Sequence, residues 1–341
     1  MKSTATAVAP LSIGVIGVGR IGRMHAHVLA HQVAGAAVGA VYDARLPIAR
    51  DVAAELGVPA TASVEEILDA DVDAVAICST ADTHVELMIA AAAAGKAVFC
   101  EKPVSLELPE LDRALAAVET AGVPFQIGFN RRFDPAHAAV REAVASGAVG
   151  EPHLVRISSR DPEPPPLEYI QTSGGLFLDM MIHDFDMARY VTASDVVEVF
   201  ARGAVRIDPD FEQAGDIDTA LVTLVHENGC LTAIDNSRRA AYGYDQRVEV
   251  FGSCGMAASE NPLANTSRVF TATGTQAPPL PYFFLERYMP SYVREWEAFV
   301  AAMQTGSPPP VSLNDARAPL LIGLAAWRSL RTGQPVGVGE R

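Results

Sequence analysis

The segment Asp179-Met-Met-Ile-His183 places a carboxylate and an imidazole four residues apart. On a helix these side chains share one face, so the carboxylate can accept a hydrogen bond from the ring and stabilise its cationic form. Such an imidazole suits removal of a hydroxyl proton during alcohol oxidation. A surface contact between helical neighbours and a metal site completed by Asp186 are the alternatives. The sequence has no H-E-x-x-H pattern and no clear third ligand, so no metal is expected.

A lysine that could serve the same chemistry occurs in Cys100-Glu101-Lys102-Pro103. These residues end a predicted strand at 96–100, and open α/β sheets bind their ligands at the carboxyl ends of strands. Pro103 restrains the backbone that directs the lysine. The alternative is a solvated lysine at the entrance to a helix.

A glycine-rich run, Gly17-Val-Gly19-Arg20-Ile21-Gly22, follows a predicted strand and opens a predicted helix. In that context it predicts a dinucleotide site. Gly17 would permit the tight turn, Gly19 the approach of a pyrophosphate, and Gly22 the close packing of helix on strand. The amides at the helix N-terminus would bind the phosphates.

An acidic residue, Asp43, ends the next predicted strand, 21 residues after Gly22. Its carboxylate would accept both ribose hydroxyls of an adenosine and repel a 2′-phosphate, which favours NAD. Ala44 and Arg45 belong to the same predicted binding turn. Arg45 could pair with a 2′-phosphate, so NADP stays open. The alternative is a tight turn in an unrelated α/β protein.

Two kinds of fold must position these residues. Residues 12 to 128 alternate β-branched runs with Ala-rich stretches, which predicts a doubly wound parallel sheet of the Rossmann type. The following part predicts an α+β domain on a large, mainly antiparallel open sheet. We expect an NAD-binding domain over 1–129 and a substrate-binding and oligomerisation domain over 130–341, with the C-terminal helix free to pack back on the first.

The predicted elements can be stated by range. In the first domain, strands are expected at 12–16, 36–43, 73–78, 96–100 and 125–129, and helices at 20–32, 46–56, 64–70, 83–94 and 107–121. In the second, helices are expected at about 135–146, 175–190, 287–304 and 314–331.

Composition limits the classes of function. With 41 acidic and 26 basic residues among 341, the net charge is −15, which disfavours nucleic acid and anionic membranes and suits a neutral or cationic substrate. Four widely spaced cysteines indicate reduced thiols, mostly buried, in a cytoplasmic protein. We find no secretion signal and no apolar run of the roughly 20 residues that span a bilayer.

Taken together, the motifs resemble those of the Gfo/Idh/MocA oxidoreductases in order and spacing, over nearly the whole chain. The motifs that carry the resemblance are GVGRIGRMH at 17–25, EKP at 101–103, GFNRRFD at 128–134 and DMMIHDFD at 179–186. Within the family the chain is most similar to inositol 2-dehydrogenases, through RRFD at 131–134, SRDP at 159–162 and YGYD at 242–245.

The resemblance implies a catalytic triad of Lys102, Asp179 and His183. His183 would take the hydroxyl proton, Asp179 would orient it, and Lys102 would hydrogen-bond the substrate oxygen. It also implies that the nicotinamide lies near residues 101–103 and that the Lys102-Pro103 peptide is cis. The further cofactor contacts that it implies are Ser79, Thr80, His84 and Glu101, beside Lys102.

The resemblance also implies substrate contacts from Arg131, Asp161 and Tyr244, beside the triad. A cyclic polyol offers a ring of neutral hydroxyls and needs several such polar groups. Each has a structural alternative: for Arg131 a salt bridge with Asp134 or another carboxylate, and for Tyr244 a buried aromatic whose hydroxyl is satisfied.

The expected reaction is NAD-dependent oxidation of myo-inositol to 2-keto-myo-inositol by hydride transfer. Its alternatives are scyllo-inositol, D-chiro-inositol or a pyranose as substrate and, from another class, a non-catalytic NAD-binding sensor. The same resemblance implies a homodimer or homotetramer. One face of the predicted antiparallel sheet could be left for a subunit partner.

Overall fold

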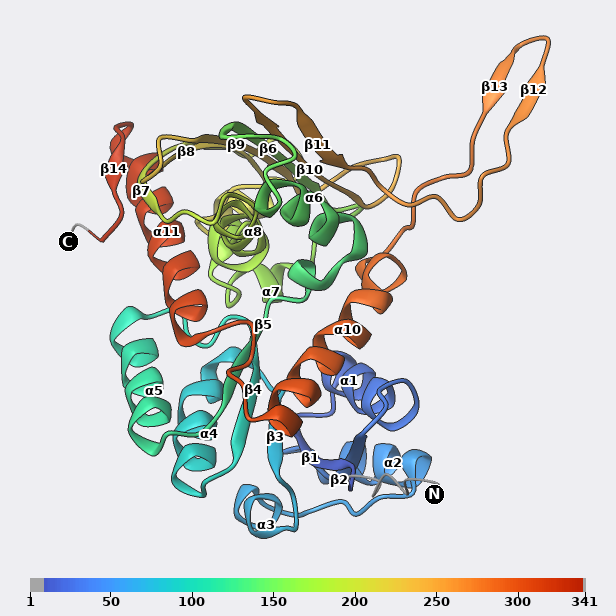
Figure 1. Ribbon diagram of the computed structural model, residues 1–341, viewed down its shortest axis with the longest axis vertical. Coiled ribbons are helices and arrows are strands. Elements are labelled where there is room, and N and C mark those ends of the chain that lie inside the picture. Colours follow the sequence, from blue (N-terminus) through green and yellow to red (C-terminus); the bar gives the residue numbers. More distant parts are fainter. Residues whose placement is uncertain (1–8, 340–341) are drawn as a thin grey trace, which may run out of the picture. The chain divides into compact units, whose positions relative to one another are not determined.

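The computed structural model describes residues 9–339, which divide into two units (Figure 1). The first unit runs to Phe129 and also takes in Tyr292–Arg317. The second comprises Asn130–Ser291 and the residues from Ala318 onward. The first unit therefore includes a segment that follows most of the second unit in the sequence.

The first unit is built on a five-stranded parallel sheet in the order β2-β1-β3-β4-β5. Figure 1 shows α4 and α5 on one side of this sheet and α1 on the other, which explains why its strands are short, continuous apolar runs. The predicted doubly wound Rossmann sheet is confirmed. Its elements are β1 (Leu11–Ile16), α1 (Arg20–His31), β2 (Ala36–Tyr42), α2 (Leu46–Leu56), α3 (Val64–Asp69), β3 (Ala74–Ile77), α4 (Ala81–Ala93), β4 (Ala97–Glu101), α5 (Leu108–Ala121) and β5 (Phe125–Gly128).

The second unit is built on a seven-stranded sheet in the order β11-β10-β6-β9-β8-β7-β14. Only β6 and β9 pair in parallel, and the other neighbours are antiparallel. This confirms the predicted, mainly antiparallel sheet. The strands are β6 (Pro152–Arg160), β7 (Val196–Ala204), β8 (Thr219–His226), β9 (Leu231–Ser237), β10 (Asp245–Gly252), β11 (Met256–Ser259) and β14 (Val336–Gly337).

Helices cover one face of this second sheet. Phe185 and Val191 of the central helix α8 pack into a core with inward residues of the strands, such as Val222 and Val250. The opposite face keeps large apolar side chains exposed, among them Leu221. The remaining helices are η1 (Asn130–Phe133), α6 (Pro135–Ala145), α7 (Leu167–Ile170), the π-helical turn η2 (Leu176–Met180), α8 (Ile182–Thr192), α9 (Asp210–Gln213), α10 (Phe284–Thr305) and α11 (Leu313–Thr332).

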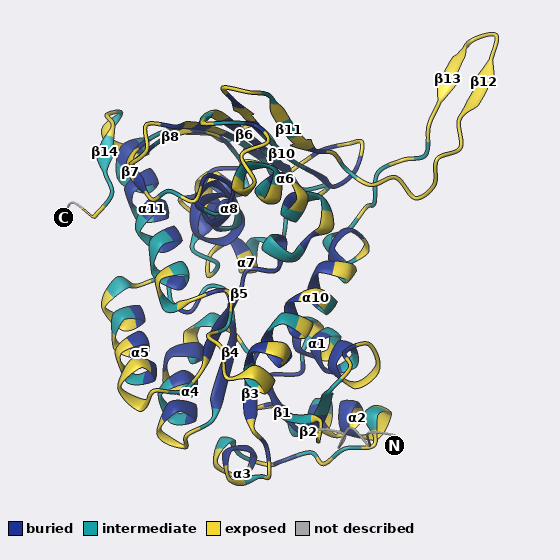
Figure 2. Cartoon of the chain, in the orientation of Figure 1, coloured by how far each residue is buried: buried dark blue, intermediate teal, exposed yellow. Residues whose placement is uncertain are grey.

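A separate hairpin leaves the second unit between β11 and α10. Its strands are β12 (Val269–Thr271) and β13 (Gly274–Gln276), and every residue in both is exposed, as Figure 2 shows. Figure 1 shows the hairpin reaching away from the seven-stranded sheet of its own unit. Among residues 9–339, no helix is both long and apolar enough to cross a membrane.

Candidate active site

The glycine-rich loop after β1 has the geometry that a dinucleotide site requires. Gly17 has a φ of +83°, and a Cβ there would lie 2.5 Å from the backbone of Ser79. A Cβ on Gly22 would lie 1.7 Å from the carbonyl oxygen of Gly17, so helix and loop could not approach as they do. A Cβ on Gly19 would meet nothing within 4 Å. The space beside Gly19, at the N-terminus of α1 where Arg20 and Ile21 begin the helix, therefore fits a pyrophosphate.

The carboxylate of Asp43 lies beside this loop. Its Oδ2 accepts the Val18 N–H at 3.0 Å and its Oδ1 accepts the Arg45 N–H at 2.9 Å. Asp43 is therefore held directly after β2, before Ala44, where it could accept a hydrogen bond from a ribose hydroxyl of a bound dinucleotide. The Arg45 guanidinium lies 3.7 Å from the same carboxylate, and its side chain is mostly exposed.

The predicted contact His84 links two turns of the first unit. Nδ1 lies 2.9 Å from the carbonyl oxygen of Pro103, and Nε2 lies 3.1 Å from that of Ser79. A neutral ring donates only one hydrogen bond, and burial lowers the pKa of His84 although both carbonyls favour its cation. The ring thereby connects the turn after β3, which includes Thr80, to the turn after β4. The Lys102-Pro103 peptide is cis, as expected.

A buried carboxyl, that of Glu295, lies within electrostatic range of Glu101 in the same unit. Glu295 on α10 is fully buried, and neither of its oxygens has a hydrogen-bond partner within residues 9–339. Burial, together with the nearby charge of Glu101, raises the pKa of Glu295. The folded chain therefore carries a proton on this carboxyl at a pH where the unfolded chain has released it.

Replacing Glu295 by Met should stabilise the fold by about 1–3 kcal/mol at neutral pH, because the substitution removes a buried polar group without a partner. The native state binds more protons than the unfolded state above the ordinary Glu pKa of about 4.3. Stability contributed by this residue therefore falls as pH rises from there, and the gain in the Met variant should grow with pH. Urea unfolding at several pH values measures this. A gain that does not change with pH would contradict the assignment, and Glu295→Gln serves as the non-titrating control.

Three strands of the second unit end side by side. Arg160, the last residue of β6, is in register with Ser237 at the end of β9 and with Asp245 at the start of β10. The next residues along these strands, Asp161 and Arg238 together with Tyr244 before β10, therefore lie at one end of the sheet.

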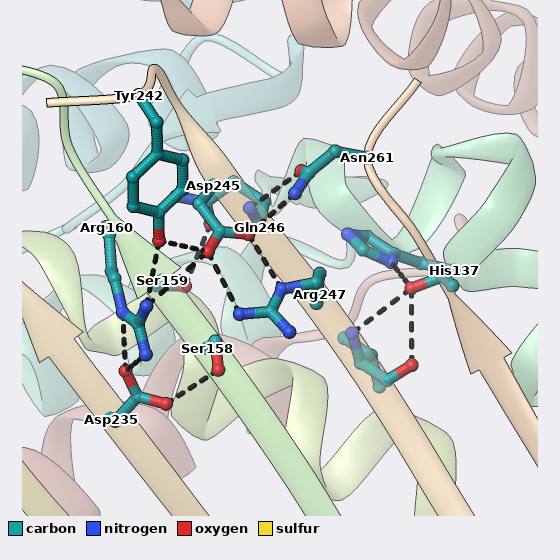
Figure 3. A network of polar contacts seen from close by, with 12 residues as sticks. His137, Ser158, Ser159, Arg160, Asp235, Tyr242, Asp245, Gln246, Arg247 and Asn261 are labelled. Atoms are coloured by element: carbon teal, nitrogen blue, oxygen red, sulfur yellow. Dashed lines mark hydrogen bonds and ion pairs between the residues drawn. The ribbon is translucent and has the colours of Figure 1, made fainter. Parts of the chain in front are cut away.

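Polar contacts hold these strand ends together (Figure 3). Arg160 donates to Asp235 of β9 at 2.7 Å and to the Tyr242 hydroxyl at 2.8 Å, and that hydroxyl donates to Asp245 at 2.7 Å. Asn261 donates to the other oxygen of Asp245 at 2.6 Å. The network ties β6, β9 and β10 and so determines where their flanking residues lie.

Arg238 joins two of the predicted site carboxylates. Its Nη2 donates to Asp179 at 3.0 Å and its Nη1 donates to Asp161 at 3.4 Å, and only 4% of its side chain is exposed. The Tyr169 hydroxyl donates to the other oxygen of Asp179 at 2.8 Å. Burial raises the pKa of Asp161, and Asp179 adds to the rise while Arg238 opposes it. We call Asp161, Asp179 and Arg238 the carboxylate clamp.

Arg238 and Tyr169 are absent from the predicted site residues. Arg238 directly follows β9, so the strand-end rule applied to Lys102 could have found it once that strand was recognised. Tyr169 lies in α7, directly after three consecutive prolines at 164–166, and no sequence signal marks it. The helix predicted at 175–190 is also wrong in one respect. Asp179 lies in the π turn and His183 in the first turn of α8, with Met181 between the two elements, because the chain does not continue as one α-helix.

Asp186, the residue that would complete the alternative metal site, forms an ion pair with Arg132. Its buried carboxylate accepts two hydrogen bonds from Arg132, at 2.8 Å from Nε and 2.5 Å from Nη2. Within residues 9–339, no group of three or more His, Cys, Asp or Glu side chains could hold a metal ion. The geometry of this helix therefore directs Asp186 to an ion pair.

Arg131 is buried and pairs with Asp184, at 2.8 Å from its Nη1, which also donates to Ser159 at 2.9 Å. The structural alternative for Arg131, a salt bridge with Asp134 or another carboxylate, is thus found with Asp184, while Asp134 pairs with Arg287. Asp134 also caps α6.

Tyr244 is buried, and burial raises its pKa, with Arg131 opposing the rise and Asp161 adding to it. The ring lies edge-on to Tyr288, with centroids 6.0 Å apart. The second unit thus brings Arg131, Asp161 and Tyr244 within electrostatic range of one another. Asp161 is in turn joined to Asp179 by the guanidinium of Arg238.

Three of the four cysteines, Cys78, Cys100 and Cys230, are buried, Cys254 is exposed, and all four are free thiols.

Comparison with known proteins places this site in a family. Residues 11–129 match the "Oxidoreductase family, NAD-binding Rossmann fold", and residues 137–258 match the "GFO/IDH/MocA C-terminal domain". The "Myo-inositol 2-dehydrogenase" of Thermotoga maritima is 48% identical over 97% of this chain and 99% of the relative. The "Inositol 2-dehydrogenase" of Rhizobium meliloti is 43% identical over 95% of this chain and 98% of the relative.

A solved structure shows the same likeness. Scyllo-inositol dehydrogenase from Lactobacillus casei, with bound cofactor NAD(H) and scyllo-inositol, aligns with a TM-score of 0.91 at 29% identity, covering 97% of this chain and 100% of that one. The glycine loop, the two sheets and these matches lead to one conclusion. The chain belongs to the Gfo/Idh/MocA oxidoreductases and is an NAD-dependent enzyme with an N-terminal Rossmann fold.

Proposed function

We propose that this enzyme oxidises myo-inositol to 2-keto-myo-inositol with NAD. The observation that carries the proposal is the carboxylate clamp, in which the buried Arg238 guanidinium after β9 lies between the carboxylates of Asp161, after β6, and Asp179, in η2. Its one guanidinium faces two carboxylates, and the neighbouring Arg131 is itself paired with Asp184. Carboxylate oxygens and guanidinium N–H groups this close together give acceptors and donors that suit a neutral molecule with several hydroxyls.

The chemistry follows from the residues in this proposal. Bound NAD supplies the acceptor for a hydride from the substrate carbon. His183 takes the hydroxyl proton, and Asp179 orients the imidazole and stabilises its cation. Lys102 donates a hydrogen bond to the substrate oxygen as negative charge develops there. Arg131, Asp161 and Tyr244 would bind the remaining hydroxyls.

The choice of myo-inositol draws on the relatives. The Thermotoga maritima protein is named for myo-inositol at 48% identity, and the Lactobacillus casei structure holds scyllo-inositol at 29% identity. Scyllo-inositol is therefore the alternative that a specific observation favours. D-chiro-inositol and pyranoses remain in the comparison as members of the same chemical class.

The test measures kcat/KM for myo-inositol, scyllo-inositol, D-chiro-inositol and glucose, each with NAD and with NADP. We expect the highest value with myo-inositol and NAD. A higher value for another substrate would overturn the assignment of myo-inositol. NADH binding without turnover of any polyol or sugar would instead support the non-catalytic sensor.

We also propose that the chain forms a homo-oligomer through the second sheet. The face opposite α8 exposes Leu221, Leu231, Phe251 and Met256, with 65% of Leu221 accessible. A second copy that covers this face would bury their apolar area. Light scattering on the purified chain gives the number of copies, and a monomer would contradict the proposal.

A further inference from the structure

The ring of His25 connects three segments of the first unit. Trp296 of α10 donates its indole N–H to Nδ1 of His25 at 2.8 Å. Because an indole nitrogen only donates, Nδ1 must carry a lone pair, and the proton of the neutral ring lies on Nε2. Nε2 lies 2.7 Å from Oε1 of Glu101. His25 therefore donates to Glu101, and Trp296 determines the tautomer that allows it.

The Glu101 carboxylate is in turn held against the next residue. Its Oε2 accepts the backbone N–H of Lys102 at 3.1 Å. On another side it lies over Gly128, where a Cβ would come within 3.1–3.2 Å of the three carboxylate atoms. The His25 ring, the Lys102 amide and the close approach to Gly128 thus restrict the position of the Glu101 carboxylate.

Further titratable groups lie within electrostatic range of Glu101, among them His84 on α4, Cys78 after β3, Cys100 on β4 and Glu295 on α10. The hydrogen bond from His25 holds one oxygen of the Glu101 carboxylate in place among them.

We propose that His25, set in one tautomer by Trp296, is a positioning residue that holds Glu101 on the Lys102 amide and so directs the Lys102 side chain toward the substrate oxygen. The direction of the Lys102 side chain toward the substrate oxygen rests on the proposed function, which gives Lys102 its role. The hydrogen bonds that connect Trp296, His25, Glu101 and the Lys102 amide are independent of that function.

Two variants of similar size separate positioning from packing. In His25→Gln the side-chain amide reaches as far as Nε2 and can still donate to Glu101. In His25→Asn the shorter amide reaches only as far as Nδ1 and keeps a partner in Trp296 alone. Both lose the ring packing against Phe99, whose centroid lies 5.4 Å away, so both should lose similar thermal stability.

Two readouts decide the proposal. Hydrogen exchange of the Lys102 amide should be at least about tenfold faster in His25→Asn than in His25→Gln, because the Glu101 contact is lost only in the former. The Asn variant should lose about tenfold or more in kcat, while the Gln variant stays within about threefold of the wild type. His226→Gln, at a buried histidine of the second unit, is the control for lost stability and should leave kcat unchanged.

Equal exchange and equal kcat in the two variants would overturn the proposal, because a purely structural role predicts that outcome. If both variants fail to fold, Trp296→Phe keeps the aromatic packing and removes only the donor. It should speed Lys102 exchange and lower kcat, and wild-type values of both would overturn the proposal. If wild-type enzyme oxidises no substrate of the panel, the proposed function fails, while amide exchange still decides whether His25 holds Glu101 on Lys102.

Discussion

Replacing His183 by Ala should lower kcat by about 10²- to 10⁴-fold, the usual contribution of a general base. Without the imidazole, the hydroxyl proton must leave to water while the hydride departs. NADH affinity should stay within about threefold, because the glycine loop and Asp43 of the first unit are untouched. Steady-state kinetics and fluorescence titration with NADH measure the two quantities.

The controls for this prediction are specific to the base. In the wild type, kcat/KM should rise with pH as the imidazole loses its proton, and this rise should be absent in His183→Ala. Added imidazole should restore part of the lost rate. His153→Ala, at an exposed strand position, should change neither property. If His183→Ala keeps kcat within about threefold of the wild-type value, His183 is excluded as the base.

Replacing Arg238 by Met should destabilise the second unit by about 3 kcal/mol, since removing one partner of a buried ion pair leaves uncompensated charge. We take the lower end of the usual range because 23% of the Asp161 side chain is exposed. The two carboxylates of the clamp would then repel each other, so Asp179 would hold its proton to higher pH and support His183 less well. Urea unfolding and the pH profile of kcat/KM measure both effects.

A second substitution tests the origin of this loss. Asp161→Asn in the Arg238→Met background removes the repulsion and should recover part of the stability. Arg238→Lys keeps the positive charge but lacks the planar guanidinium that donates to both carboxylates, so its activity should lie between those of the wild type and Arg238→Met. Unchanged stability in Arg238→Met would show that the clamp contributes little to the fold.

The first unit could be predicted closely because its determinants are local. Gly17 and Gly22 are required by a turn and a close packing contact within one β-α connection, and apolar runs identify the buried strands. The alternation of strand and helix then leaves few arrangements of a parallel sheet. Asp43 follows from the same short unit.

Much of the candidate site could not be predicted, because its contacts join residues distant in sequence. Arg238 meets Asp179 only through the parallel pairing of β6 with β9 and the packing of η2 beneath them. The pairing of Arg131 with Asp184 over Asp134 depends on where α8 packs, and no spacing rule encodes that choice. His25 belonged to a recognised motif, yet its partner Trp296 lies far along the chain in α10.

The strand order of the second sheet also has a consequence for synthesis on the ribosome. β6 pairs with β9 and β10, both of which are translated later, and β10 ends at Gly252 while β6 ends at Arg160. At about 5–20 residues per second, the growing chain carries β6 without its full set of neighbours for about 5–20 seconds. Val155 and Ile157 are buried in the finished sheet, and until β10 emerges they lack part of the structure that buries them. We therefore expect protection of this strand during that interval to raise the yield of folded enzyme.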